Sequence, residues 1–166
     1  MIRFAAIPLA VLGVLPAASL AQVAQPPSHP APPAATQVAM VEAPEACVYC
    51  GMNRTRFSRS RMLVSYPDGS QVGTCSIHCT AIELKKTQGT AAKALLVGDR
   101  GDGAHKLIDA RAAVWVIGGS ERGVMTPVAK WAFARKEDAE AFIQKSGGKL
   151  AGFEEALAVA TQELKK

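Results

Sequence analysis

Short segments in which hydrophobic and polar residues alternate recur along the chain, and this alternation predicts half-buried β-strands. The first such segment, residues 61–66, is followed by a Pro-Asp-Gly-Ser turn at 67–70 and by a returning segment at 71–74, which together predict a hairpin. Further strands are predicted over residues 93–97, 113–117, 128–133 and 149–151.

Three other segments repeat apolar residues at the spacing of an α-helix, over residues 76–87, 136–146 and 153–164. Thr74 or Ser76 can cap the first of them. The order strand, strand, helix, strand therefore occurs twice and is followed by a last helix. The sequence predicts an α+β domain of two similar halves around antiparallel sheet, with a C-terminal helix.

The first 40 residues have a different composition. Residues 1–21 carry a cation at Arg3, an apolar run and small residues at their end, as a secretory signal peptide does. Residues 22–40 are rich in Pro and Ala, which predicts a disordered linker. Residues 41–166 remain as one metal-binding domain. The apolar run is shorter than the roughly 20 residues of a membrane span, so we expect an exported, periplasmic protein that is soluble after cleavage.

The formal net charge is +5 at pH 7 and becomes +4 when Arg3 leaves with the signal peptide. A positive charge favours acidic partners or anionic surfaces, whereas export excludes nucleic acid as a natural partner. The chain has four cysteines, all within the domain. The compartment beyond a bacterial-type signal peptide is oxidising, so disulfides are permitted there.

Five residues of types that can bind metals are grouped in the sequence. Cys47 and Cys50 lie in a loop before the first strand, and three more lie at the start of the first helix, namely Cys75, His78 and Cys79. The last three stand at i, i+3 and i+4, so we expect them on one helix face. A helix N-terminus stabilises negative charge, which should favour the Cys75 thiolate. The intervening hairpin can return Cys75 close to Cys50.

Three kinds of chemistry fit these residues. The cysteines can form two disulfides that brace an interaction module. Alternatively, the CxxC pair can bind a structural zinc ion together with Cys75, Cys79 or His78. A thiol-disulfide oxidoreductase is the third alternative, although its CxxC normally opens a helix and here precedes a strand.

Met52 favours copper as the bound metal. Thiolate and thioether are soft ligands that select Cu(I). Gly51, between Cys50 and Met52, lets the backbone fold tightly enough for both sulfurs to meet one ion. We therefore predict that Cys50 and Met52 hold Cu(I), that Cys47 or His78 adds a ligand, and that the exposed loop transfers the metal by ligand exchange.

A basic stretch follows the loop that carries Cys47, Cys50 and Met52, and this stretch includes Arg54, Arg56 and Arg59. Cations at this place can steer an acidic partner protein toward the metal and can favour neighbouring thiolates. These arginines are the predicted partner-docking residues.

The sequence resembles the NosL family over almost the whole domain. The likeness rests on segments 47–52 (CVYCGM), 61–62, 67–69, 108–110, 125–127, 131–134 and 137–142. It implies a periplasmic Cu(I)-binding accessory protein, not an enzyme, that delivers copper during maturation of nitrous oxide reductase. It also implies an α+β fold of two related halves. In that family the Cys-Gly-Met unit is associated with Cu(I), which carries over to Cys50 and Met52.

Two features depart from the family pattern. Typical members are lipoproteins, whereas this chain has no cysteine at its predicted cleavage site. The group formed by Cys75, His78 and Cys79 is not part of the pattern either. A divergent NosL-like branch that serves another copper client is therefore an alternative, and the extra group can be a disulfide, a second metal site or part of one site.

Overall fold

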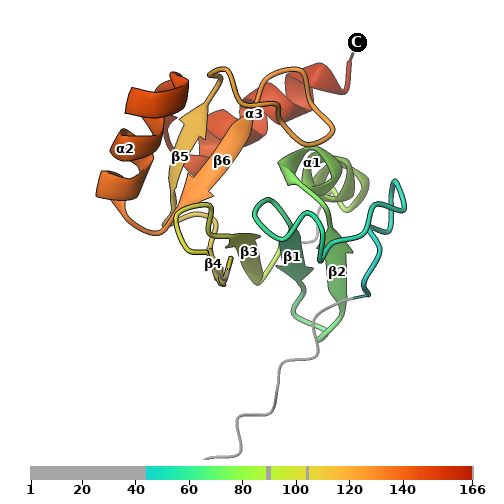
Figure 1. Ribbon diagram of the computed structural model, residues 1–166. Coiled ribbons are helices and arrows are strands. Elements are labelled where there is room, and N and C mark those ends of the chain that lie inside the picture. The colour runs from blue at the N-terminus through green and yellow to red at the C-terminus, as the bar shows by residue number, and fades with distance from the viewer. Residues whose placement is uncertain (1–43, 89–90, 104, 166) are drawn as a thin grey trace, which may run out of the picture. The chain divides into compact units, whose positions relative to one another are not determined.

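The computed structural model describes residues 44–88, 91–103 and 105–165, which belong to one compact unit (Figure 1). The predicted signal peptide and linker lie outside the described residues. They stay predictions, as does the domain boundary at residue 41. No helix in the described ranges is both long and apolar enough to cross a bilayer.

The first half forms a four-stranded antiparallel sheet with the strand order β2-β1-β3-β4. Its strands are β1 (Met62–Ser65), β2 (Gln71–Thr74), β3 (Ala94–Gly98) and β4 (Leu107–Asp109). The predicted hairpin is confirmed, since β1 pairs with β2 and the backbone N–H of Tyr66 donates to the carbonyl oxygen of Ser70 at 2.9 Å. The hairpin carries the chain out from the CxxC loop and back to Cys75.

The second half forms a three-stranded antiparallel sheet with the order β6-β5-β7. Its strands are β5 (Val114–Ile117), β6 (Lys130–Phe133) and β7 (Lys149–Ala151). In β2-β1-β3, as in β6-β5-β7, the first strand of the half lies between the second and the third. The prediction of an α+β fold with two similar halves is therefore confirmed. The sequence pattern did not specify that each half has a sheet of its own.

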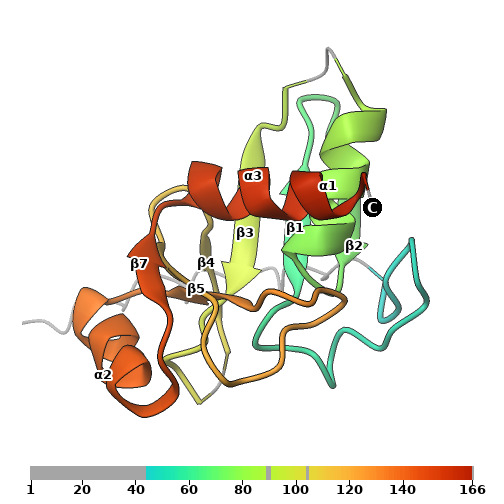
Figure 2. The ribbon, with the colours of Figure 1, turned by 90° about the horizontal axis from the view of Figure 1, so that it is seen from above.

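Three helices cover these sheets: α1 (Ile77–Lys86), α2 (Lys136–Ser146) and α3 (Phe153–Glu163). Helix α1 contacts β1 and β2, and α2 contacts the strands of the second sheet. Helix α3 contacts both β5 and α1, and Figure 2 shows it running from β7 toward α1. The C-terminal helix thus joins the two halves of the domain.

Two strands differ from the prediction. Strand β4 was missed because three residues at a sheet edge are too few for an alternating pattern to be recognised. Strand β6 begins at Lys130, two residues later than predicted, and its residues are all buried. The Lys130 ammonium donates to the carbonyl oxygen of Val128 at 2.7 Å and pairs with the Glu163 carboxylate at 2.9 Å. These contacts allow a lysine to occupy the core.

Buried apolar side chains form two clusters. The first lies between the first sheet, α1, α3 and β5. The second surrounds Trp131 and Phe133 of β6 and includes three cysteines, Cys47, Cys75 and Cys79. The cysteines therefore belong to the core where the first half meets the second sheet.

Candidate metal centre

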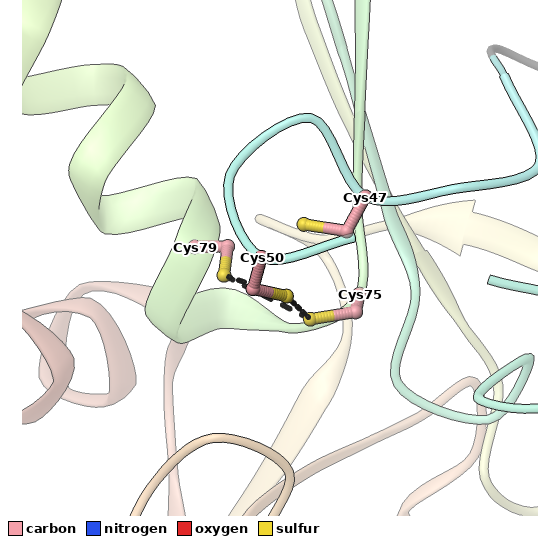
Figure 3. Close-up of side chains that lie close together, drawn as sticks. All are labelled: Cys47, Cys50, Cys75 and Cys79. Carbon is pink, nitrogen blue, oxygen red and sulfur yellow. Dashed lines mark hydrogen bonds between the residues drawn. The ribbon is translucent and has the colours of Figure 1, made fainter. Parts of the chain in front are cut away.

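Four cysteine side chains converge at one place in the fold (Figure 3). Cys47 and Cys50 come from the loop before β1, Cys75 from the junction of β2 and α1, and Cys79 from the first turn of α1. Their Sγ atoms all lie within 4.8 Å of one another, and all four are free thiols. The predicted proximity of Cys75 to Cys50 is confirmed.

The sulfur spacing fits a single metal ion. The Sγ atom of Cys50 lies 3.4 Å from that of Cys75 and 3.8 Å from that of Cys79, and the last two are 3.8 Å apart. Four sulfurs arranged tetrahedrally around a metal at about 2.3 Å are about 3.8 Å from one another. The thiols are therefore spaced for ligation of one ion, whereas any disulfide would require two sulfurs to approach to about 2.05 Å.

A tight turn carries the first two cysteines to the cluster. Ala46 and Asn53 form an antiparallel bridge at its base. The N–H of Cys47 donates to the carbonyl oxygen of Met52 at 2.8 Å, and the N–H of Gly51 donates back to Cys47 at 2.9 Å. Gly51 has φ 72°, a conformation that residues with a side chain rarely adopt. The CxxC pair thus lies in a closed turn and does not open a helix.

The start of α1 positions the other two cysteines. Ser76 is the N-cap residue, so Cys75 precedes the helix and Cys79 lies in its first turn. This corrects the expectation that Cys75 is itself in the first turn. The Ser60 hydroxyl donates to the carbonyl oxygen of Cys75 at 2.9 Å, which fixes Cys75 at the strand end. Its sulfur nevertheless lies beside that of Cys79.

The thiols differ in acidity. The pKa of Cys75 is lowered to about 6, first because of its hydrogen bond with the Cys79 thiol and also because of that with the Cys50 thiol. The pKa of Cys50 is raised to about 11, chiefly by burial. The pKa of Cys79 is also raised, first by its hydrogen bond with Cys75 and then by burial. The pKa of Cys75 is thus lowered, in the direction predicted, but hydrogen bonds with the neighbouring thiols are the cause.

Cys50 is the member of the cluster nearest the surface. Cys47, Cys75 and Cys79 are between 0% and 3% exposed, whereas Cys50 is half-buried. Its neighbours Val48 and Gly51 are exposed, with 53% of Val48 accessible. A metal in the cluster would therefore have its nearest approach to solvent at Cys50.

Two predicted ligands, Met52 and His78, are not among the four grouped side chains. Met52 is half-buried and packs against the same buried group as the cysteines. His78 is on α1, but it is not a member of the set of ligand atoms within 4.8 Å of one another. Its Nδ1 is buried without a hydrogen-bond partner in the described part of the chain. The structure thus groups the four cysteines and does not bring His78 to them.

The three predicted docking arginines lie in different environments. Arg54 is 2% exposed, so it is not available for docking, contrary to the prediction. Its guanidinium donates, at 3.1 Å in each case, to the backbone carbonyl oxygens of Pro44, Met62 and Thr74. A planar group with five N–H donors suits such bracing of several segments. Arg59 is half-buried at 5.7 Å from the Trp131 ring, and Arg56 is exposed.

Sequence reasoning missed Glu83. Its buried carboxylate accepts hydrogen bonds from the hydroxyls of Tyr49 and Tyr66. Glu83 stands four residues after Cys79, so both occupy one face of α1. This spacing was the available signal, but a glutamate in an amphipathic helix is usually solvated.

The chain is similar to known proteins in sequence and in fold. A model of the NosL family matches residues 37–159. The chain is similar to the crystal structure of the copper chaperone NosL from Shewanella denitrificans, with 28% identity, a TM-score of 0.53, and coverage of 66% of this chain and 87% of that one. The solution structure of apo-NosL from Achromobacter cycloclastes is 21% identical with a TM-score of 0.40, and 56% and 82% of the two chains are covered. No curated protein sequence matches the chain significantly.

Proposed function

Because the chain belongs to the NosL family, we propose that it is a periplasmic accessory protein that binds Cu(I) and delivers it to a copper enzyme. The similar protein from Shewanella denitrificans is a copper chaperone. In this proposal the chain is a metal carrier and not an enzyme. Its client is nitrous oxide reductase during maturation, or a similar cuproenzyme.

The observation that carries the proposal is the convergence of four thiols within 4.8 Å. An ion at their centre would have only sulfur ligands, and sulfur selects soft ions such as Cu(I). Cys50 and Cys75 are the two ligands on which we place most weight, because their sulfurs lie 3.4 Å apart and the pKa of Cys75 is lowered to about 6. Cys79 and Cys47 complete the set.

Met52 is a further ligand in this proposal. Its thioether belongs to the Cys-Gly-Met unit, and its side chain packs against the buried apolar cluster that contains three of the cysteines. A neutral thioether binds Cu(I) without the cost of removing a proton. Met52 can therefore keep the ion bound while a thiolate is exchanged.

Delivery to a client would begin at Cys50. A half-buried ligand between exposed neighbours can be replaced by a sulfur of the partner without unfolding of the core. The exposed Arg56 and the half-buried Arg59 follow this loop and can attract an acidic partner. The buried cysteines would then release the ion last.

The test is an anaerobic titration of the reduced domain with Cu(I) against a colorimetric chelator. We expect stoichiometric uptake by the parent and loss of uptake in Cys50→Ser. Val48→Ser is the matched control, because it alters the same exposed loop without removing a ligand. Uptake by Cys50→Ser equal to that of the parent would refute the proposal.

A structural zinc ion is the second candidate, favoured by the near-tetrahedral sulfur spacing. Native mass spectrometry of protein purified from its own compartment separates the two. A copper carrier should be purified with bound copper or without metal. A protein with a structural zinc site should be purified with zinc, and its cysteines should be free thiols after unfolding. Disulfide bracing would appear as the loss of four hydrogens.

A further inference from the structure

Both tyrosines of the chain donate to the same carboxylate. The sequence has two tyrosines, Tyr49 and Tyr66. The hydroxyl of Tyr49 donates to Oε2 of Glu83, and that of Tyr66 donates to Oε1 at 2.6 Å. Glu83 is 5% exposed and forms no ion pair with any described residue. A buried carboxylate needs such donors, so the two hydroxyls are its stabilising partners.

The bond from Tyr49 joins the two segments that carry the thiols. Tyr49 lies between Cys47 and Cys50 in the loop, and Glu83 lies one turn after Cys79 on α1. Tyr66, in contrast, follows β1 at the hairpin turn and lies outside the CxxC loop. One carboxylate therefore makes two hydrogen bonds, of which one spans the cysteine cluster and the other does not.

We propose that Glu83 is a positioning residue for the metal site, which holds the CxxC loop against α1 through Tyr49 and thereby slows release of the bound ion. This inference rests on the proposed function. Among the described residues, the backbone hydrogen bonds of the loop at 47–52 run within the loop itself and from Val48 to Gly73 of β2 at 3.3 Å, and none reaches α1. Besides the Tyr49 hydroxyl, the Sγ atom of Cys50 contacts α1 at Cys79, at 3.8 Å.

Alignment of ligands explains why this bond affects the metal. A site loses affinity when its ligands depart by roughly 0.5 Å from the bound geometry. Without the Tyr49 hydroxyl the loop can move away from α1, and the sulfurs of Cys47 and Cys50 then separate from that of Cys79. The buried charge of Glu83 makes the bond stronger than one between neutral groups.

The two tyrosines provide a matched pair of variants. Tyr49→Phe and Tyr66→Phe each remove one hydroxyl from the same carboxylate. Tyr66→Phe also removes the hydrogen bond between that hydroxyl and Oγ1 of Thr87 at 3.1 Å, so it should lower the thermal stability of the domain at least as much as Tyr49→Phe. A merely structural role for Glu83 predicts the same consequences from both. A positioning role predicts that only Tyr49→Phe changes the metal site.

The experiment has two measurements on each variant. Stopped-flow transfer of bound Cu(I) to a chelator should be about tenfold faster in Tyr49→Phe than in the parent, since an altered charged hydrogen bond changes rates by this order. In the reduced metal-free protein, alkylation of the buried Cys47, read by peptide mass spectrometry, should also accelerate in Tyr49→Phe. In Tyr66→Phe, the rate of Cu(I) transfer and the rate of Cys47 alkylation should each remain within about twofold of the parent.

Equal effects of the two variants, or no effect of Tyr49→Phe, would overturn the inference. If the parent takes up no Cu(I), the proposed function fails, while the labelling of Cys47 still decides whether Glu83 positions the loop. The two failures are therefore distinguishable.

Discussion

The Sγ atom of Cys50 lies 3.4 Å from that of Cys75, although 25 residues separate the two cysteines along the chain. The β1–β2 hairpin closes this distance, because it carries the chain away from the CxxC loop and returns it beside the loop. The site thus depends on tertiary structure and is absent from the unfolded chain.

Metal affinity should depend steeply on pH. Cys75 is already ionised above about pH 6, whereas Cys50, with a pKa near 11, and Cys79 must each lose a proton when they bind. Each released proton raises the apparent affinity about tenfold per pH unit, so Cys50 and Cys79 together contribute about a hundredfold per pH unit between about pH 7 and 9. Chelator competition at several pH values measures this slope, and an affinity independent of pH would contradict the assignment of these thiols.

The tyrosines should resist ionisation in the folded protein. Burial, and then the hydrogen bond to Glu83, raises the pKa of Tyr49 and of Tyr66 above the ordinary value of 10.0. The unfolded chain therefore ionises first, so this contribution to stability is complete below pH 10.0 and falls as the pH rises through the folded pKa values.

Near-ultraviolet absorbance of tyrosinate checks this during an alkaline titration. In the parent, the two tyrosines should ionise only when the protein unfolds. In Glu83→Gln, they should ionise at lower pH. Identical titration curves for the two proteins would show that Glu83 does not hold the hydroxyls.

Arg54 should be essential for stability and not for docking. Arg54→Met removes donors from three carbonyl groups, which should lower the free energy of unfolding by about 3 kcal/mol or more. The exposed Arg56 provides the control, since Arg56→Met should stay within about 0.5 kcal/mol of the parent. Urea denaturation measures both, and similar midpoints for the two variants would disprove the bracing role.

Gly51 should be required for its backbone conformation alone. A Cβ at this position would meet nothing within 4 Å, but φ is 72°. Gly51→Ala should therefore cost about 1–2 kcal/mol of stability and should weaken metal binding through distortion of the loop. Gly103→Ala is the control, because that glycine also faces open space and has no positive φ. Thermal unfolding with and without metal compares the stabilities of the two variants. Equal stability of Gly51→Ala and Gly103→Ala would mean that the turn tolerates a side chain at position 51.

Local patterns were sufficient to predict most of the fold. The alternating segment before Pro67 and the helical spacing within 136–146 are determined by residues close in sequence, and the structure has these elements where they were expected. Strand β4 was missed because its pairing with β3, not its own three residues, defines it.

The site was only partly predictable for the same reason. The hairpin suggested that Cys75 approaches Cys50, but the exclusion of His78 and the burial of Arg54 depend on how α1 and the loop pack. Glu83 gave no signal of its own, because its role comes from two tyrosines that are distant in sequence.

Copper K-edge X-ray absorption of the reduced domain, loaded with one equivalent of Cu(I), tests the central claim most directly. The cluster predicts a first shell of at least three sulfurs and no nitrogen or oxygen, with a changed spectrum or no bound copper in Cys50→Ser. A shell that contains nitrogen or oxygen in place of sulfur, or a spectrum that Cys50→Ser leaves unchanged, would contradict the claim that these four thiols form a Cu(I) site.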